Sequence, residues 1–153
     1  MNVSKDFEEL FAFFRKHGVE FVIVGGYAVS FHAKPRYTKD IDVLVRSTRD
    51  NAKRLLAALT EFGFGNVGLA IDDFTLDGVI VQLGRPPNRI DLLTSISGVS
   101  FESIWEHRCA GKFGDVHVDY IGREELIANK ESVARPQDLL DVKWLRAAAK
   151  TAR

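Results

Sequence analysis

The stretch that decides the fold runs from Phe21-Val-Ile-Val-Gly-Gly-Tyr-Ala-Val29 to Tyr37-Thr-Lys-Asp-Ile-Asp-Val-Leu-Val45. A strand-like apolar run ends at two glycines, a short helix-like segment follows, and a second strand-like run carries Asp40 and Asp42. Side chains two apart in an extended strand share a face, so both carboxylates should point one way and the apolar residues between and after them the other. Two carboxylates this close repel each other unless a cation lies between them. The pair therefore predicts a Mg²⁺ site, because this hard cation is commonly held by carboxylates together with substrate phosphates.

Length and composition limit the number of domains and the class of protein that the chain can form. The chain has 153 residues, 46% hydrophobic and 27% charged, which fits one globular domain spanning residues 1–153 with a real core. The 21 basic and 21 acidic residues balance, so no large net field predicts a nucleic-acid or membrane partner, although a local basic patch stays compatible. Cys109 is the single cysteine, which excludes an internal disulfide and fits a reducing cytoplasm. The start of the chain lacks the apolar core of a signal peptide, and no stretch is apolar over the length of a membrane span.

The glycine pair Gly25-Gly26 lies between the first strand and a helix-like segment from Tyr27 to His32. Glycine lets backbone N–H groups approach an anion, and a helix N-terminus adds partial positive charge, so this arrangement can cradle a phosphate. An ordinary tight turn is the alternative, and taken alone it is the commoner outcome. The loop Lys34-Pro-Arg-Tyr-Thr-Lys39 then places three cations in six residues before the carboxylate strand. Loops mounted on rigid strands often carry binding groups, and a solvated basic turn is the alternative here.

Helical and strand-like patterns alternate along the chain. Apolar residues at helical spacing predict helices over 7–14 and 51–62, each followed by a glycine. Short apolar runs at 68–71, 74–76 and 79–83 are strand candidates, with a hairpin turn at Asp77-Gly78. Such alternation favours an α/β (α+β) fold in which helices flank a sheet.

A third carboxylate completes the pattern. Asp91 lies between apolar neighbours in the strand candidate 89–93, the same form as the Asp40-Ile-Asp42 strand. If the two strands lie side by side, three carboxylates converge on one edge of the sheet. Unpaired charge in a low dielectric costs several kcal/mol, and a metal would offset that cost. The alternative is structural: Asp91 could pair with Arg89 or Arg36.

Together these pieces resemble a known superfamily. Gly25-Gly26, then Asp40-Ile-Asp42 after thirteen residues, and later Asp91 on its own strand are similar to the nucleotidyltransferases that include DNA polymerase β and small bacterial enzymes. The segment Arg36-Tyr-Thr-Lys-Asp-Ile-Asp-Val43 is similar to that of small stand-alone bacterial members, including toxins of the toxin–antitoxin type. Two later segments, Glu125–Lys130 and Arg135–Asp141, also resemble those members.

The resemblance implies a polymerase β-like nucleotidyltransferase fold with a mixed sheet flanked by helices. It implies transfer of a nucleoside monophosphate from a nucleoside triphosphate such as ATP to an acceptor hydroxyl, with release of pyrophosphate. The catalytic residues, which would also hold two Mg²⁺ ions, are Asp40, Asp42 and Asp91. The triphosphate would be bound by Gly25, Gly26, Arg36, Thr38, Lys39 and Lys130. Many members carry Ser where Gly26 stands, so this chain would rely on backbone N–H groups there.

Partners and alternatives follow from the same resemblance. The acceptor could be tRNA, a protein or a small hydroxylated molecule, and an antitoxin could be a partner. A non-catalytic nucleotide-binding or protein-interaction module on the same fold is the runner-up, and it would be favoured by loss of a carboxylate that this chain retains. A scaffold role would be favoured by an exposed apolar patch at Phe7, Phe11 and Phe14. Asp138 and Asp141, early in the final helix, are interpreted as capping residues.

Overall fold

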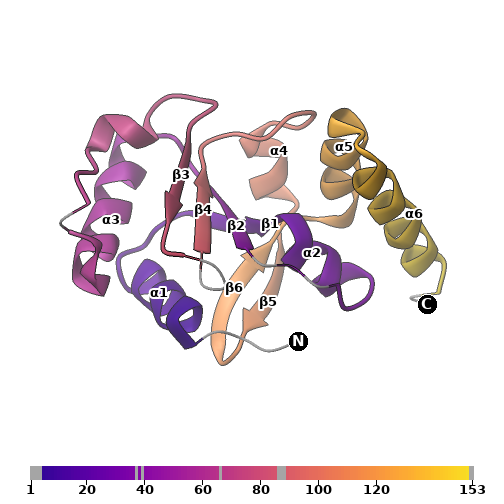
Figure 1. Cartoon of the computed structure of the whole chain (residues 1–153), viewed down its shortest axis with the longest axis horizontal. Coiled ribbons are helices and arrows are strands. Elements are labelled where there is room, and N and C mark those ends of the chain that lie inside the picture. The colour runs from indigo at the N-terminus through magenta and orange to yellow at the C-terminus, as the bar shows by residue number, and fades with distance from the viewer. Residues whose placement is uncertain (1–4, 37, 39, 66, 86–88, 152–153) are drawn as a thin grey trace.

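The computed structural model describes residues 5–36, 38, 40–65, 67–85 and 89–151. Its centre is a mixed sheet of six strands in the order β3-β4-β2-β1-β6-β5 (Figure 1). The strands are β1 (Phe21–Val24), β2 (Asp40–Val45), β3 (Ile80–Leu83), β4 (Arg89–Leu93), β5 (Cys109–Phe113) and β6 (Val116–Tyr120). The pairs β2–β4 and β1–β6 are parallel and the other three are antiparallel, so the predicted mixed sheet is confirmed.

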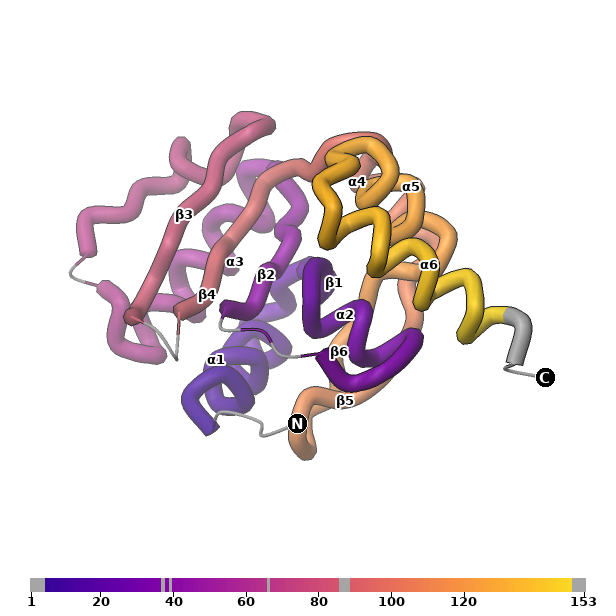
Figure 2. The backbone as a smooth tube through the Cα atoms, turned by 45° about the vertical axis from the view of Figure 1, so that its right-hand side comes forward, coloured from indigo at the N-terminus to yellow at the C-terminus, as the bar shows by residue number. Residues whose placement is uncertain are grey.

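Among the described residues, six α-helices flank this sheet. They are α1 (Lys5–Lys16), α2 (Gly25–His32), α3 (Arg49–Leu59), α4 (Phe101–Glu106), α5 (Arg123–Val133) and α6 (Pro136–Thr151). Helices α1 and α3 pack against each other, whereas α2 contacts both α5 and α6 in a separate group (Figure 2). This separation matters for function because the second group lies beside the aspartates of β2.

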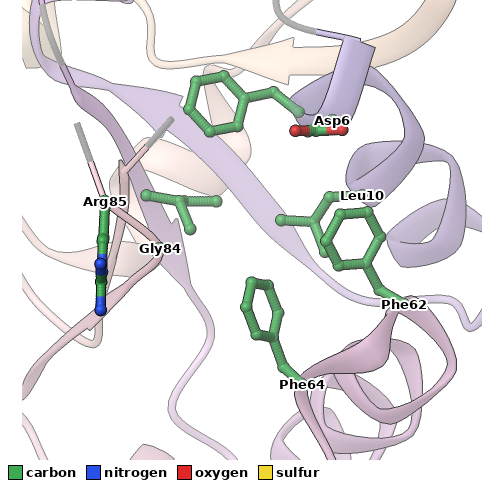
Figure 3. Close-up of a pocket in the computed structure, with 8 residues that line it drawn as sticks. Asp6, Leu10, Phe62, Phe64, Gly84 and Arg85 are labelled. Carbon is green, nitrogen blue, oxygen red and sulfur yellow. The ribbon is translucent and has the colours of Figure 1, made fainter. Parts of the chain in front are cut away.

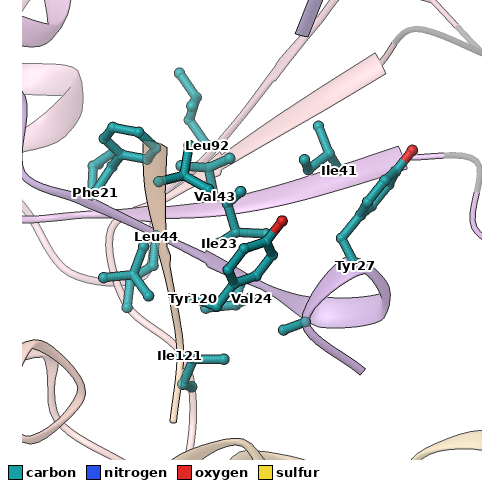
Figure 4. Close-up of a cluster of buried hydrophobic side chains, with 14 of the residues drawn as sticks. Phe21, Ile23, Val24, Tyr27, Ile41, Val43, Leu44, Leu92, Tyr120 and Ile121 are labelled. Carbon is teal, nitrogen blue, oxygen red and sulfur yellow. The ribbon is translucent and has the colours of Figure 1, made fainter. Parts of the chain in front are cut away.

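The apolar core explains why these segments adopt their structures. The four central apolar residues of α1 recur at helical spacing and are all buried: Phe7, Leu10, Phe11 and Phe14. Phe11 stacks on Phe21 of β1, with ring centroids 5.5 Å apart. The apolar side chains of β1 and β2 fill the layer shown in Figure 4. The N-terminal helix therefore packs into the core, and its phenylalanines form no exposed patch for a scaffold role.

The segment between α3 and β3 departs from the sequence prediction. The strands predicted at 68–71 and 74–76 are wrong, because residues 68–70 and 75–76 form no strand and Ile71–Phe74 form a 3₁₀ helix, η2. The Ala70 N–H donates to the Asp73 carboxylate at 2.7 Å, which stabilises a helical turn instead of an extended chain. The predicted helix over 51–62 breaks after Leu59, and a π-helical turn, η1 (Thr60–Phe64), continues it across a kink at Gly63.

A cavity of about 310 Å³ lies on the α1 side of the sheet (Figure 3). It is lined by Asp6, Phe7, Leu10, Phe62, Phe64, Gly84, Arg85 and Ile90. Ile90 precedes Asp91 on β4, and successive strand residues face opposite sides. The cavity is thus across the sheet from the aspartates. No helix within the described part of the chain is long and apolar enough to span a membrane.

Candidate active site

Strand pairing brings the predicted carboxylates together. In the parallel ladder between β2 and β4, Asp40 lies opposite Arg89 and Asp42 lies opposite Asp91. Alternation along each strand then puts all four charged side chains on one face, while Ile41 and its neighbours on the other face are buried. The structure therefore places the two strands side by side, as the shared apolar–Asp–apolar form predicts.

The carboxyl groups of Asp42 and Asp91 interact directly. Burial raises the pKa of Asp42 to about 6, and the charge of Asp91, a hydrogen bond with it and the charge of Asp40 act in the same direction. The positive charge of Lys130 opposes this rise in the pKa. A cation bound here would relieve the repulsion among the carboxylates.

Arg89 partly supplies that positive charge. Its Nη2 lies 2.7 Å from Asp40 Oδ2 and 3.4 Å from Asp91 Oδ2, so it bridges the two strands. Its Nε lies 3.2 Å from Asp91 Oδ1, close enough for an ion pair but without hydrogen-bond geometry. The structural alternative, a pair between Asp91 and Arg89, is therefore present.

No group of three His, Cys, Asp or Glu side chains in the described part of the chain is arranged to hold a metal ion. The Arg89 guanidinium contacts two of the three expected carboxylates, Asp40 and Asp91. The donor set nevertheless suits a hard cation. Asp40 Oδ1 and Asp91 Oδ1 are buried oxygens without a hydrogen-bond partner, and carboxylate oxygens are the ligands that Mg²⁺ prefers.

The glycine pair forms the first turn of α2, which begins at Gly25 and not at the predicted Tyr27. Its N-cap is Val24, whose side chain cannot accept a hydrogen bond from the helix N-terminus. Gly25 has a φ of 67°, and a Cβ there would lie 2.3 Å from Asp42 Oδ2. A Cβ at Gly26 would lie 2.8 Å from Arg36 Nη1. Gly25 is therefore needed for the close approach of Asp42 to the start of α2, and the absence of a side chain at Gly26 leaves room for Arg36.

The predicted phosphate-binding residues lie around this turn where the structure describes them. Thr38 donates its hydroxyl to the Asp40 carbonyl at 3.0 Å, and its Oγ1 lies 3.1 Å from the position of a Cβ on Gly26. Lys130, although far from this turn along the chain, is buried on α5 and acts on the pKa of Asp42. Lys39 lies outside the described residues.

Two further carboxylates, on α6, belong to the same cluster. Asp138 accepts the Arg135 N–H at 3.2 Å, which agrees with a capping role, and it also lies 3.3 Å from Lys130 Nζ. Burial works to raise the pKa of Asp138, but hydrogen bonds from Arg135 and Lys130 hold the pKa below its usual value. Asp141 is wrongly interpreted as a cap, because its buried carboxylate instead contacts Lys130 and Arg36. Its spacing of three from Asp138, on one helix face, is the signal that could have revealed it.

Comparison with known proteins identifies the family. The sequence profile of a family described as nucleotidyltransferase of unknown function (DUF6036) matches residues 1–149. The chain belongs to this nucleotidyltransferase family. No curated protein matches its sequence.

Solved structures share the fold of this nucleotidyltransferase. The lincosamide antibiotic adenylyltransferase LnuA, lincomycin-bound, has a TM-score of 0.59 at 14% identity, covering 97% of this chain and 99% of its own. ANT(2'')-Ia in complex with adenylyl-2''-tobramycin has a TM-score of 0.52 at 14% identity, and the match covers 96% of this chain and 87% of ANT(2'')-Ia. A nucleotidyltransferase-like protein from Paracoccidioides brasiliensis has a TM-score of 0.50 at 15% identity, and the match covers 95% of this chain and 76% of that protein. The predicted polymerase β-like nucleotidyltransferase fold is confirmed.

Proposed function

We propose that this nucleotidyltransferase moves a nucleoside monophosphate from a nucleoside triphosphate to an acceptor hydroxyl. The bond from the α-phosphorus to the acceptor oxygen forms, the bond to the β-phosphate oxygen breaks, and the hydroxyl proton and pyrophosphate leave. The observation that carries the proposal is the parallel register that sets Asp42 beside Asp91, next to the uncapped glycine N-terminus of α2.

The carboxylates suit two Mg²⁺ ions. Asp40, Asp42 and Asp91 would hold them, and the buried Oδ1 atoms of Asp40 and Asp91, which have no hydrogen-bond partner, support this assignment. When bound, the ions would neutralise the triphosphate and stabilise the charge that develops on the departing pyrophosphate. Arg89, whose side chain is 29% exposed, would have to release the carboxylates when the ions bind.

Backbone and side-chain groups of the protein would position the triphosphate and the attacking hydroxyl. Backbone N–H groups at Gly25 and Gly26 would hold phosphate oxygens at the positive end of α2. Arg36, Lys130 and the hydroxyl of Thr38 would bind the remaining phosphate oxygens, with Lys39 a further cation for the same task. Asp91, beside the metal ions, would also help to activate the attacking hydroxyl.

A small hydroxylated molecule is the acceptor class that we propose to test first. The chain has a net charge of +0, and RNA binding usually requires clustered cations to neutralise phosphates. Two fold neighbours are named for antibiotic acceptors, lincomycin and tobramycin, and LnuA matches over nearly its whole length. A tRNA or a protein acceptor, with an antitoxin as partner, would appear as other outcomes of the same experiment.

The experiment is transfer of label from each α-labelled nucleoside triphosphate, with Mg²⁺, to a panel of small hydroxylated compounds, total tRNA and cell protein. We expect label in one fraction only. Asp42→Asn should lower the rate by at least about 100-fold, the scale found when one group that stabilises transition-state charge is lost. Equal labelling by the wild type and this variant would refute the proposal.

A non-catalytic nucleotide-binding or protein-interaction module is the second candidate. The Arg89 bridge between Asp40 and Asp91 favours it, since its single positive charge offsets part of the charge of two carboxylates without a metal. In that case nucleotide would bind to the purified protein without any transfer of label. Binding would then be insensitive to Mg²⁺ and to Asp42→Asn.

A further inference from the structure

Asp141 occupies an unusual place for a charged residue. It lies on α6 with 0% of its surface exposed, and such a carboxylate is costly unless it is paired. Its Oδ2 lies 3.1 Å from Lys130 Nζ and its Oδ1 lies 3.5 Å from Arg36 Nε. The exposed Gln137 donates to Oδ1 at 2.9 Å. Asp141 therefore connects two predicted phosphate-binding cations that lie far apart in the sequence.

Neutralising Lys130 does not by itself require Asp141. Asp138, which is also buried, lies 3.3 Å from the same ammonium. The contact that distinguishes Asp141 is the one to Arg36, and no contact between described residues joins Arg36 to Asp138. This difference points to a task at Arg36.

The Arg36 guanidinium spans two points of the site. Its Nε faces Asp141, and its Nη1 lies 2.8 Å from the position that a Cβ on Gly26 would take. The planar guanidinium has several N–H donors in a fixed arrangement, so holding Nε also orients the Nη1 end. The missing side chain of Gly26 leaves the room that this arrangement needs.

We infer that Asp141 is a positioning residue, which orients Arg36 at the N-terminus of α2 so that its outer nitrogens meet the triphosphate. The inference rests on the proposed function, because it assumes that phosphates bind at this turn. Asp141 also fixes the Lys130 ammonium from a second side. The C-terminal helix thereby contributes to nucleotide binding without touching the nucleotide.

The direction in which the triphosphate affinity changes when the charge of Asp141 is removed distinguishes a positioning role from simple electrostatic competition. Asp141→Asn keeps size and removes one negative charge beside two cations. If Asp141 merely competed with phosphate for those cations, the variant would bind triphosphate more tightly. If Asp141 is a positioning residue, the variant should bind triphosphate more weakly despite the added positive charge, by about tenfold or more, the scale known for groups that orient the ligands of a metal ion.

The test is calorimetry of the full-length protein with Mg²⁺ and a non-hydrolysable nucleoside triphosphate, together with inorganic triphosphate as a probe. Asp138→Asn is the matched control, because it removes a buried carboxylate from Lys130 but not from Arg36. Thermal unfolding of each variant shows how much of the protein is folded. Arg36→Lys and Arg36→Gln form a second comparison that does not depend on the folding of Asp141→Asn.

We expect Asp141→Asn to weaken triphosphate binding more than Asp138→Asn, and to add little in an Arg36→Gln background. Arg36→Lys should lose nearly as much affinity as Arg36→Gln, since a lysine cannot reach both points. Unchanged or tighter binding by Asp141→Asn, or full affinity in Arg36→Lys, would overturn the inference while the proposed function survives. A wild type that binds no triphosphate would overturn both.

Discussion

At the scale of single residues, Gly25 shows how little freedom the site has. Its positive φ is costly for any residue with a side chain, and a Cβ would lie 2.3 Å from the carboxylate of Asp42. Two separate costs therefore act at one position. The chain offers a control for the first, because Gly78 has a φ of 78° but nothing within 4 Å of its Cβ position.

Gly25→Ala should lower the free energy of unfolding by about 2–3 kcal/mol, of which about 1 kcal/mol comes from the positive φ. The remainder comes from displacing Asp42, which should also impair nucleotide binding. Urea unfolding measures the first effect and calorimetry the second. Gly78→Ala should show only the backbone cost and bind nucleotide normally. Equal behaviour of the two variants would mean that the contact with Asp42 is unimportant.

At the scale of elements, helix α2 is fixed at both ends. Its N-terminus lies against the aspartates, and near its C-terminus the His32 Nε2–H donates to the Ile121 carbonyl, just past β6, at 2.6 Å. Burial lowers the pKa of His32, the carbonyl contact raises it, and the charge of Arg123 lowers it, for a net decrease. The folded protein therefore favours the neutral imidazole more than the unfolded chain does.

This lowered pKa predicts a pH dependence of stability. As the pH falls through 6.5, the His32 of the unfolded chain takes up a proton more readily than that of the folded chain, so the free energy of unfolding should fall as the pH falls. His32→Gln removes this contribution and should flatten the curve just below 6.5. The wild type must be compared with His32→Gln, because the raised pKa of Asp42 makes the free energy of unfolding rise as the pH falls below about 6 in both proteins. Parallel curves from chemical unfolding at several pH values would contradict the prediction.

At the scale of the whole molecule, the candidate site joins segments that are distant in the sequence. Strands β2 and β4 supply the carboxylates, α2 supplies the anion-binding turn, and α5 and α6 supply the buried charge cluster. Anything that binds this assembly, and not the unfolded chain, stabilises the fold by mass action.

Mg²⁺ with a non-hydrolysable nucleoside triphosphate should therefore raise the melting temperature. At 100 times the dissociation constant the gain in the free energy of unfolding is about 2.7 kcal/mol. Scanning calorimetry measures the shift, with either component alone as a reference. The Asp42→Asn variant should lose the part of the melting-temperature shift that depends on Mg²⁺. A shift of the same size in this variant would place the metal elsewhere.

Local patterns alone determined a good part of this protein. Helical spacing of the phenylalanines predicted α1, and the repeated apolar–Asp–apolar form predicted that Asp42 and Asp91 lie on neighbouring strands. The nucleotidyltransferase family and the mixed sheet were implied by the resemblance that these motifs carry. The periodic features can be predicted from sequence because periodicity and turn chemistry depend on residues that are close in the chain.

The tertiary structure decided what depends on contacts between distant segments. The parallel register of β2 and β4 sets Arg89 against Asp40, and no pattern within either strand specifies that pairing. The burial of Asp141 beside Arg36 follows from the packing of α6 against α2, so its sequence position suggested only a cap. Register and burial are set by long-range packing, and local sequence spacing does not record them.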